Sequence, residues 1–442
     1  MGQREPAGAS ADLIQRLADG SMTAIDSVDE CTAAYSAWEP ALHAFAWFDR
    51  DRVRARATDL DRAEHAVRGP LYGIPVGVKD IFDTMGIPTE YGSQVFSGRL
   101  PAATALTVSR LESAGAIVFG KTVTAELAYF APGPTTNPWN PDHTPGGSSM
   151  GSAAAVAAGI VPIAVGTQTN GSVIRPAAFC GVVGLKPTFG RLPTGGVLKF
   201  SPSLDQLGVF GRTVETTAAF AAVMAGDPPY AWSAHTNMGK PRTLALVRTS
   251  EFDLAETGAL DQFETVVDAL RSAGAAIREI ELPRGLSNAL SIHRTIMAAE
   301  ASRFISPQLV HAEGLVSPQL AALLEEGSAI GESKYRAALD SQASMTAEFA
   351  RVAIDFDAIL TLPALGEAPP IATTGDPRCC TRWTLLGAPA ITLPAGLGPN
   401  GLPLGIQLVG QIGQDRKLID TAQWCEGIWP GLGNPPRPAE RP

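Results

Sequence analysis

Two glycine-framed serine clusters are the residues of this 442-residue chain whose type and spacing could carry out chemistry. Ser148 and Ser149 lie in GGSSMGS at 146–152, and Ser172 follows Ser148 by 24 residues in TNGSVIRP at 169–176. A serine in a glycine-rich turn exposes its Oγ and leaves backbone N–H groups free around it. Nucleophilic acyl transfer needs both, because the hydroxyl attacks while N–H donors stabilise the oxyanion. The two clusters therefore point to acyl-transfer chemistry.

A lysine ends an apolar segment well before the serines. Lys79 closes GPLYGIPVGVK at 69–79, which the glycines and prolines mark as a short strand. Burying an ammonium group is costly. One interpretation is that Lys79 extends its amino group to solvent along an apolar stem. The other is that it is desolvated and neutral, and so able to accept a proton. The strand alone favours the first interpretation, and the serine clusters favour the second.

The elements that must position these residues alternate between helices and strands. Small side chains from Met150 onward predict a tightly packed helix, which a short buried strand follows. The segment 104–114 predicts an amphipathic helix leading into the strand AIVFGKT at 116–122. This alternation predicts an α/β fold around a largely buried sheet. Further buried strands are expected at 356–364, 387–396 and 402–410, and a helical outer layer or lid is expected at 287–354.

A long loop precedes the first serine cluster. Residues 124–147 are rich in Pro, Asn and Thr, and loops of this length in compact domains tend to be functional. Tyr129, Phe130 and Trp139 within the loop either line a pocket or pack beneath it. The sequence favours neither alternative, although aromatic side chains would suit an apolar or aryl substrate.

Composition excludes several classes of protein. The hydrophobic fraction of 45% and the charged fraction of 18% are typical of a folded globular chain. A net charge of −10 argues against nucleic acid or an anionic membrane as the main partner. The most apolar stretch, 153–166, is too short for a membrane span, and the N-terminus lacks a signal pattern. Five cysteines without CxxC spacing predict reduced thiols, so we expect a cytoplasmic protein.

Metal and nucleotide chemistry find little support. The six histidines form no HxxxH or HExxH pair, so neither a zinc site nor any other cofactor is expected. A non-enzymatic alternative treats the glycine-rich turn as a phosphate-binding loop. GGSSMGS lacks the GxxxxGK[ST] order, and Lys186 lies far downstream.

Several segments together resemble the amidase signature family of serine hydrolases. They are GPLYGIPVGVKD, PGGSSMGSAAAVAAG, GTQTNGSVIRPAAFCGVVGLKPT, LDQLGVFGRTVE and GAPAITLPAG. The resemblance implies a central mixed, twisted, multi-stranded sheet with helices on both faces. It also implies one domain over 1–442, with its core at about 60–215 and 355–425 and an outer helical layer or lid at about 285–355.

The same resemblance implies a Ser–cis-Ser–Lys triad. Ser172 would be the nucleophile, Ser148 the bridging serine after a cis peptide bond, and Lys79 the general base. Ser149 and Thr167 would support them. The oxyanion hole would be made of backbone N–H groups from Thr169, Asn170, Gly171 and Ser172.

Three residues bear on substrate specificity: Arg175, and two positions at which this chain departs from the usual family pattern. Arg175 stands where some relatives contact an acidic substrate group, and a structural ion pair near the site is the equal alternative. Met150 stands where the family often has Gly or Ser, and Asn170 where it often has Gly. Asn tolerates left-handed backbone better than other residues with a side chain, so the donor turn can persist. The Asn170 side chain would narrow or polarise the acyl pocket.

Two enzymatic functions follow from the resemblance. The first is a free-standing amidase that hydrolyses a carboxylic amide, and possible related substrates are esters and carbamates (urethanes). The second is the glutaminase subunit of a tRNA-dependent amidotransferase, for which the chain is short and shows no distinctive glutamine-binding segment. The expected partner is a small-molecule amide, ester or carbamate, and the family makes a homodimer plausible.

Overall fold

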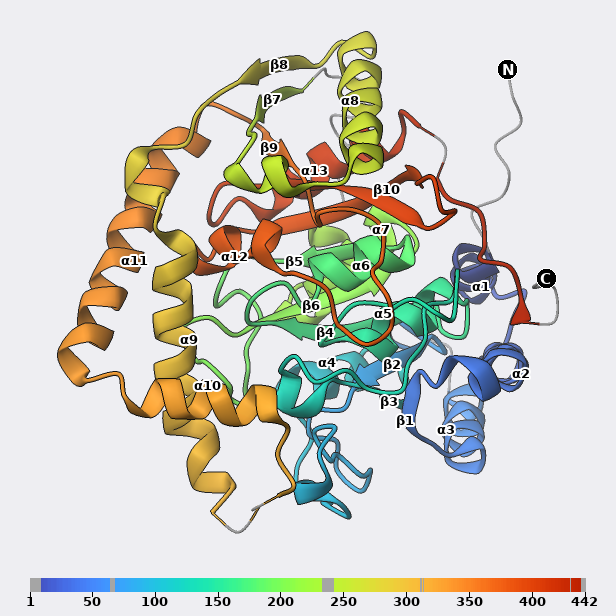
Figure 1. The fold of residues 1–442 in the computed structure, drawn as a ribbon. Coiled ribbons are helices and arrows are strands. Elements are labelled where there is room, and N and C mark those ends of the chain that lie inside the picture. Colours follow the sequence, from blue (N-terminus) through green and yellow to red (C-terminus); the bar gives the residue numbers. More distant parts are fainter. Residues whose placement is uncertain are drawn as a thin grey trace.

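The computed structural model describes residues 9–63, 68–232, 242–310, 312, 314–429 and 431–438. These residues build one mixed, 11-stranded sheet in the order β1-β3-β2-β4-β6-β5-β10-β11-β9-β7-β8 (Figure 1). The strands are β1 Phe45–Phe48, β2 Pro75–Lys79, β3 Ile117–Thr122, β4 Ile163–Gln168, β5 Val183–Lys186, β6 Gln206–Gly211, β7 Thr243–Leu246, β8 Ala276–Glu279, β9 Ala358–Thr361, β10 Ala390–Leu397 and β11 Pro403–Val409. β2 runs parallel to both β3 and β4. Along the sheet from β4 through β6, β5, β10 and β11 to β9, each strand is antiparallel to the next.

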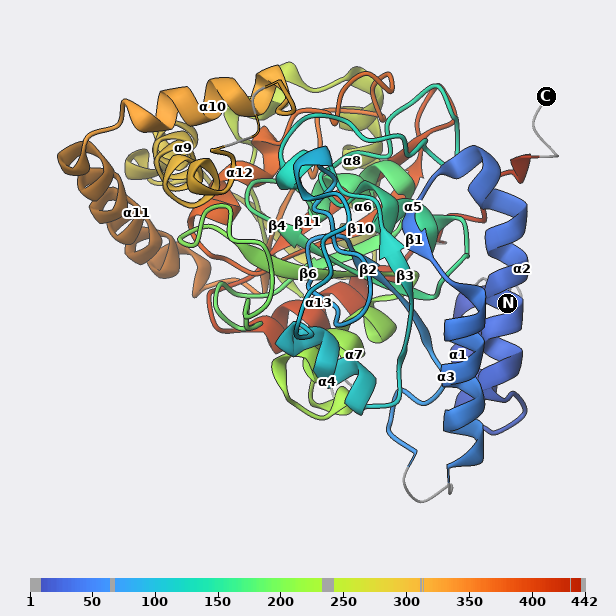
Figure 2. The same ribbon diagram turned by 90° about the horizontal axis from the view of Figure 1, so that it is seen from below.

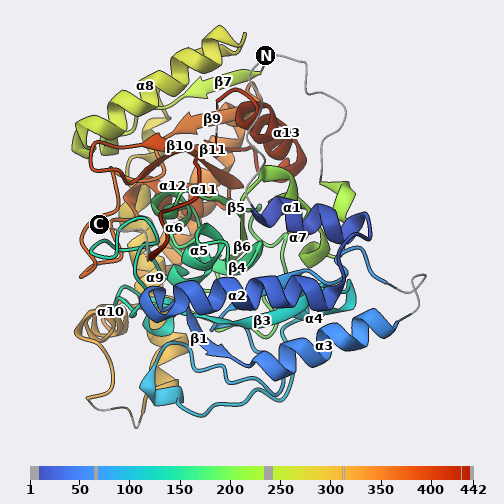
Figure 3. The ribbon, with the colours of Figure 1, turned by 90° about the vertical axis from the view of Figure 1, so that its right-hand side faces the viewer.

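Helices cover both faces of this sheet (Figure 2). α5 and α6 pack on one face, and α7 and α13 pack on the other. α1 to α3 lie at the β1 end, and α8 lies at the opposite end beside β8 (Figure 3). The helices are α1 Ala9–Ala18, α2 Ala24–Leu42, α3 Arg50–Arg62, α4 Leu106–Ser113, α5 Met150–Ala157, α6 Ile174–Cys180, α7 Val214–Ala225, α8 Thr257–Ser272, α9 Ala289–Ile305, α10 Pro318–Ser328, α11 Glu332–Ala353, α12 Arg378–Leu385 and α13 Asp415–Glu426. The predicted fold class is therefore confirmed.

The central strands are buried on both faces, which explains their composition. Every residue of β2, β4 and β6 is buried, and a strand covered on both sides carries a continuous apolar run. α5 reaches this layer because its side chains are small. A Cβ at Gly151 would lie 2.2 Å from Ala44 O and 2.4 Å from Val123 N, so only glycine allows this approach. The run of small residues thus brings the serine-bearing start of α5 onto the sheet.

The sequence did not indicate every element. β1, β5, β6 and α6 lie in segments for which the pattern gave no element. The segment 287–354 does form helices α9, α10 and α11. The five cysteines are free and buried. Among the described residues, no helix combines the length and the apolar composition that crossing a membrane requires.

Candidate active site

Lys79 ends β2 with none of its surface exposed, which excludes the solvent-reaching interpretation. Its Nζ lies 2.8 Å from Ser148 Oγ and 2.9 Å from Thr167 Oγ1. Thr167 belongs to the parallel neighbour β4, so the register of the two strands puts both side chains at one edge of the sheet. Burial holds the pKa of Lys79 well below its ordinary range, and the Asp205 carboxylate opposes that shift. These surroundings suit an uncharged amine.

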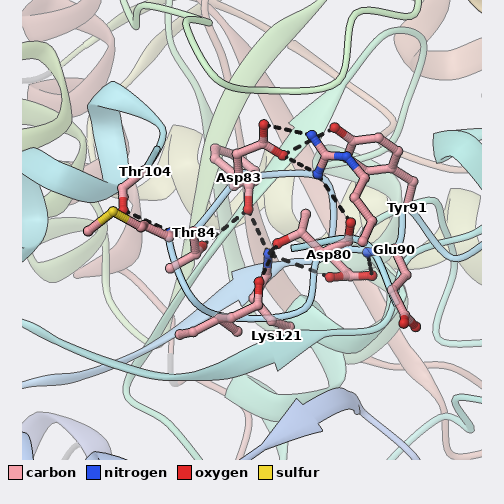
Figure 4. A network of polar contacts seen from close by, with 12 residues as sticks. Asp80, Asp83, Thr84, Glu90, Tyr91, Thr104 and Lys121 are labelled. Carbon is pink, nitrogen blue, oxygen red and sulfur yellow. Dashed lines mark hydrogen bonds and ion pairs between the residues drawn. The ribbon is translucent and has the colours of Figure 1, made fainter. Parts of the chain in front are cut away.

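Lys121, on the neighbouring strand β3, is also fully buried but has different partners. Its Nζ donates to Phe82 O and to Thr89 Oγ1, both at 2.6 Å, and lies 3.5 Å from Asp80 Oδ1. Figure 4 shows this amino group facing the Asp80 carboxylate within a wider polar network. Burial lowers the pKa of Lys121 to about 8, so the ammonium form still prevails at neutral pH beside Asp80.

A third buried lysine, Lys186, completes the comparison. Its Nζ donates to oxygens of Pro187, Gln206 and Ala388. Carbonyl and carboxylate oxygens only accept hydrogen bonds, so all partners of Lys186 and most partners of Lys121 suit a donating group. The exception is the Thr89 hydroxyl beside Lys121, which donates its own proton to Ile87 O at 3.3 Å. The two hydroxyls around Lys79 can also donate, and a neutral amine needs such a donor for its lone pair. The partners of the three lysines therefore single out Lys79 as a possible base.

The Asp80–Lys121 pair supplies a stability prediction. Lys121→Met would leave the Asp80 carboxylate buried without its counter-charge, and breaking a buried pair in this way costs roughly 3 kcal/mol. We expect urea unfolding to show a loss of that size in the free energy of unfolding. The double variant Asp80→Asn/Lys121→Met should regain part of it, because no charge then remains. A loss below about 1 kcal/mol in the single variant would contradict a structural role for the pair.

Ser148 and Ser149 lie immediately before α5 and beside Lys79. The peptide bond between Gly147 and Ser148 is cis, as the resemblance implied. Ser149 Oγ lies 3.2 Å from Thr167 O, to which it donates, and 3.3 Å from Thr167 N, from which it accepts. Ser149 thus holds the backbone of the residue whose hydroxyl contacts Lys79.

Ser172 lies in the turn that joins β4 to α6. The Gln168 side chain closes this turn, since its Oε1 accepts from Val173 N at 2.8 Å and from Ile174 N at 3.0 Å. Its Nε2 donates to Thr384 Oγ1 at 2.9 Å, which ties the turn to α12. The turn is therefore fixed by side chains from within and from outside.

The backbone of this turn offers unused donors. The N–H groups of Asn170, Gly171 and Ser172 donate no hydrogen bond to any described residue. The carbonyl of Thr169, in contrast, faces His293 Nε2 at 2.8 Å. Converging N–H groups without partners can stabilise a developing oxyanion.

A narrow cleft brings most of the predicted site residues together. Its wall contains Ala128, Tyr129, Phe130, Ser148, Thr169, Asn170, Ser172, Arg175, Phe200, Met297 and Thr374. Ser148 and Ser172 share the wall, yet no hydrogen bond joins their hydroxyls in this structure. Such contacts are often long in free enzymes and tighten when substrate binds.

The aromatic residues of the long loop lie in two different places. Tyr129 and Phe130 line the cleft with ring centroids 4.9 Å apart, and Tyr129 stacks on Phe200 at 5.6 Å. Trp139 packs in a separate apolar cluster and donates its Nε1–H to Cys180 O at 2.9 Å. The loop thus supplies two aromatic wall residues, while Trp139 is ordinary packing.

Comparison with known proteins identifies the family. The family model described as Amidase matches residues 26–419. The chain belongs to the amidase family. Among curated relatives, one subunit of the Glutamyl-tRNA(Gln) amidotransferase of Chloroflexus aurantiacus is 34% identical, over 91% of this chain and 93% of its own. The corresponding subunit from Synechococcus sp. (strain WH7803) is 32% identical, over 95% of this chain and 96% of its own.

Solved structures of amidases agree with the fold. A structure described only as an amidase superposes with a TM-score of 0.86 at 30% identity, covering 94% of this chain and 99% of its own. The peptide amidase from Stenotrophomonas maltophilia gives 0.84 at 27% identity, covering 97% and 99%. The curated relatives are also matched over 93% and 96% of their length. That the chain is short for an amidotransferase subunit stays a prediction.

Arg175 is buried at the cleft with unused hydrogen-bonding capacity. Only 2% of its surface is exposed, and its Nη2 donates to Gly147 O at 2.7 Å. Its Nε and Nη1 are buried and contact no acceptor among the described residues, and it forms no ion pair with a described carboxylate. Burial lowers the pKa of Arg175 to about 10, which leaves it charged at neutral pH. The structural ion pair considered from the sequence is therefore absent from the described part of the chain.

Sequence reasoning missed several residues that build this candidate site. Asp205 accepts from Thr169 Oγ1 at 2.6 Å and influences Lys79, and it lies in LDQLGVFGRTVE, one of the segments behind the family resemblance. That motif could have pointed to it. His293 and Thr384 lie on helices α9 and α12, where no motif marked them.

Proposed function

We propose that this amidase hydrolyses a carboxylic amide through an acyl-enzyme on Ser172. Ser172 Oγ attacks the carbonyl carbon, Ser148 passes the proton to Lys79, and a C–O bond forms as the C–N bond breaks. Lys79 returns the proton through Ser148 to the leaving nitrogen. Water then attacks the ester by the same proton path and releases the carboxylic acid.

One observation carries this proposal: Lys79 is fully buried and contacts two hydroxyls, at 2.8 and 2.9 Å. A lysine at its ordinary pKa of about 10.4 is charged at neutral pH and cannot accept a proton. The lowered pKa of Lys79 removes that obstacle. The unpartnered N–H groups of Asn170, Gly171 and Ser172, with Thr169 beginning the turn, support an oxyanion hole next to the nucleophile.

A panel of purified-enzyme assays tests the proposal. Short aliphatic, aryl and dicarboxylic amides, with matched esters and carbamates, would be offered to the chain alone, and release of amine or alcohol would be followed. We expect turnover of at least one amide and formation of a covalent adduct on Ser172 in mass spectrometry. No turnover and no adduct across the panel would reject a free-standing amidase.

A second candidate is the glutaminase subunit of a tRNA-dependent amidotransferase. The curated relatives at 32–34% identity carry the name of an amidotransferase subunit, which favours this function over a free-standing amidase. The same proton path on Ser172 would then release ammonia from glutamine, and a protein partner would be required. The family match gives the phosphate-loop alternative no support.

Glutamine separates the two candidates. A free-standing amidase should hydrolyse its amide substrate alone and should prefer it to glutamine. A glutaminase subunit should release little ammonia alone and should respond to its partner subunits and charged tRNA. Ammonia release from glutamine that rises at least tenfold with partner subunits would decide for the second candidate.

Arg175 is proposed to bind an acceptor group of the substrate. Its free Nε and Nη1 could meet a carboxylate or carbonyl, and hydrogen bonds to charged groups contribute about 1.5–3 kcal/mol each. We expect Arg175→Met to lower kcat/KM for a dicarboxylic monoamide by about 10-fold to 100-fold. For an uncharged amide of the same length, the loss should stay within about threefold.

The comparison of the two substrates is the control for this prediction. Arg175→Met also removes the bond to Gly147 O, and that loss would affect both substrates equally. Arg175→Lys keeps the charge without the planar guanidinium. Its kcat/KM for the charged substrate should lie between the values of wild type and Arg175→Met. Equal losses on both substrates would show that Arg175 only supports the backbone.

A further inference from the structure

Helix α9 of the outer layer reaches the proposed site with one of its faces. α9 lies between α11 and the sheet (Figure 1). His293, Met297 and Glu300 recur at the spacing of one helix face. Met297 lines the cleft, and Glu300 accepts from Ser201 Oγ at 2.7 Å in the segment that carries Phe200. The outer layer therefore contributes to the site and does not merely cover it.

His293 makes the contact closest to the chemistry. Only 1% of the surface of His293 is exposed, and its Nε2 lies 2.8 Å from Thr169 O. Burial lowers the pKa of His293 to about 4, so the imidazole is neutral at neutral pH. The proposed mechanism needs Lys79 to be uncharged at the same pH. Because a carbonyl only accepts, the hydrogen bond assigns the ring proton to Nε2. His293 thus donates to the first carbonyl of the Ser172 turn.

Peptide geometry makes this contact relevant to the oxyanion hole. In a planar trans peptide, the C=O of one residue and the N–H of the next point in opposite directions. The carbonyl of Thr169 points at His293, so Asn170 N–H points away from it. Thr384 Oγ1 likewise donates to Asn170 O, so Gly171 N–H, the next group in the chain, points away from Thr384. Neither N–H has a partner among the described residues.

We propose that His293 is a positioning residue, which fixes the Thr169–Asn170 peptide from α9 so that Asn170 N–H is aimed at the oxyanion. The inference rests on the proposed acyl transfer at Ser172. It gives the outer helix a role in transition-state stabilisation, because a donor held in place beforehand needs no reorganisation during the reaction. We therefore expect the contact to affect the transition state and to leave substrate binding in the ground state nearly unchanged.

Three variants at one position test the proposal. His293→Leu removes the donor and should lower kcat by about 10-fold to 100-fold, with KM changed by less than about threefold. His293→Gln places an amide N–H near the position of Nε2 and should recover most of kcat. His293→Asn is too short to place it there and should resemble His293→Leu. Thr295→Ala is the matched control and should keep wild-type kcat, because among the described residues the Thr295 hydroxyl bonds to Ser291 O within α9 and to no residue of the cleft.

A transition-state analogue separates positioning from structural support. A substrate-derived aldehyde, which forms a tetrahedral adduct with a serine, should bind His293→Leu about 10-fold to 100-fold more weakly than wild type. The carboxylic acid product should bind both enzymes with equal affinity. A purely structural role would weaken both ligands together.

The outcomes distinguish this inference from the proposed function. If Ser172→Ala is inactive and His293→Leu keeps kcat within about threefold, the inference is overturned while the function stands. If His293→Gln fails to recover activity although its melting temperature matches wild type, the inference is also overturned. If His293→Leu does not fold, the contrast between the Gln and Asn variants decides. Turnover that survives Ser172→Ala would instead overturn the proposed function.

Discussion

Ser172→Ala is expected to lower kcat by about 10⁵-fold while leaving the protein folded and able to bind substrate. The reason is that the covalent path disappears together with the hydroxyl, and only oxyanion donors and binding remain. In wild type, rapid quenching during turnover should trap an acyl group on the peptide that carries Ser172. That adduct should be absent from the variant. We would measure kcat and KM with one chromogenic amide and the adduct by mass spectrometry.

Ser152→Ala is the matched control for this loss. Ser152 is another buried serine of the same region, and its Oγ contacts Thr122 Oγ1 at 2.7 Å and Val165 O at 3.0 Å. It does not line the cleft. We expect a stability change of about 1 kcal/mol and a kcat within about threefold of wild type. Full activity in Ser172→Ala would end the acyl-enzyme proposal.

Local motifs made much of this arrangement predictable. Glycines and small residues around Ser148 mark a turn and a close-packed helix, and an apolar run ending in Lys79 marks a buried strand. β2 and β4 are parallel neighbours, so their ends meet at one edge. The α/β class and the contact between Lys79 and Ser148 follow from such short-range signals once the resemblance fixes the topology.

Contacts from distant elements could not be predicted in this way. β6 inserts between β4 and β5 although it follows both in the chain, and no local pattern carries that order. His293 looks like any helical residue, and its meaning arises only because α9 packs against a turn 124 residues away. Arg175 was ambiguous for the same reason, because its lack of an ion pair with any described carboxylate is a tertiary property. Propensity and spacing report on neighbours in sequence. They could therefore not predict the contacts that α9 and other distant elements make with the site.

The second large effect is expected at Lys79. Lys79→Met should lower kcat/KM by about 10⁴-fold, because no group then accepts the proton from Ser148. Lys79→Arg should be equally inactive, since a guanidinium stays protonated at all accessible pH values. Both variants keep a long side chain in the cavity, and melting temperatures would confirm that they fold. Substantial turnover in either variant would show that another group is the base.

The pH dependence of the wild-type enzyme tests the same base without mutation. Lys79 works only when neutral, so kcat/KM should fall as pH drops through its lowered pKa and should be level above it. The acid limb must therefore lie well below the ordinary lysine pKa of about 10.4. A profile whose acid limb sits near 10 would contradict the assignment.

Replacing Asp205 should shift the pKa of Lys79 in a known direction, which gives a second test of Lys79 as the base. The Asp205 carboxylate favours the ammonium form of Lys79 and raises its pKa against the larger effect of burial. Asp205→Asn should therefore lower that pKa further and move the acid limb of kcat/KM to lower pH, even if the loss of the Thr169 contact lowers the rate at every pH. A structural defect changes the height of the profile, whereas a change in charge near the base changes its midpoint. A limb that moves to higher pH in Asp205→Asn would mean that the titrating group is not a buried amine, because removing a nearby negative charge cannot raise the pKa of a cationic acid.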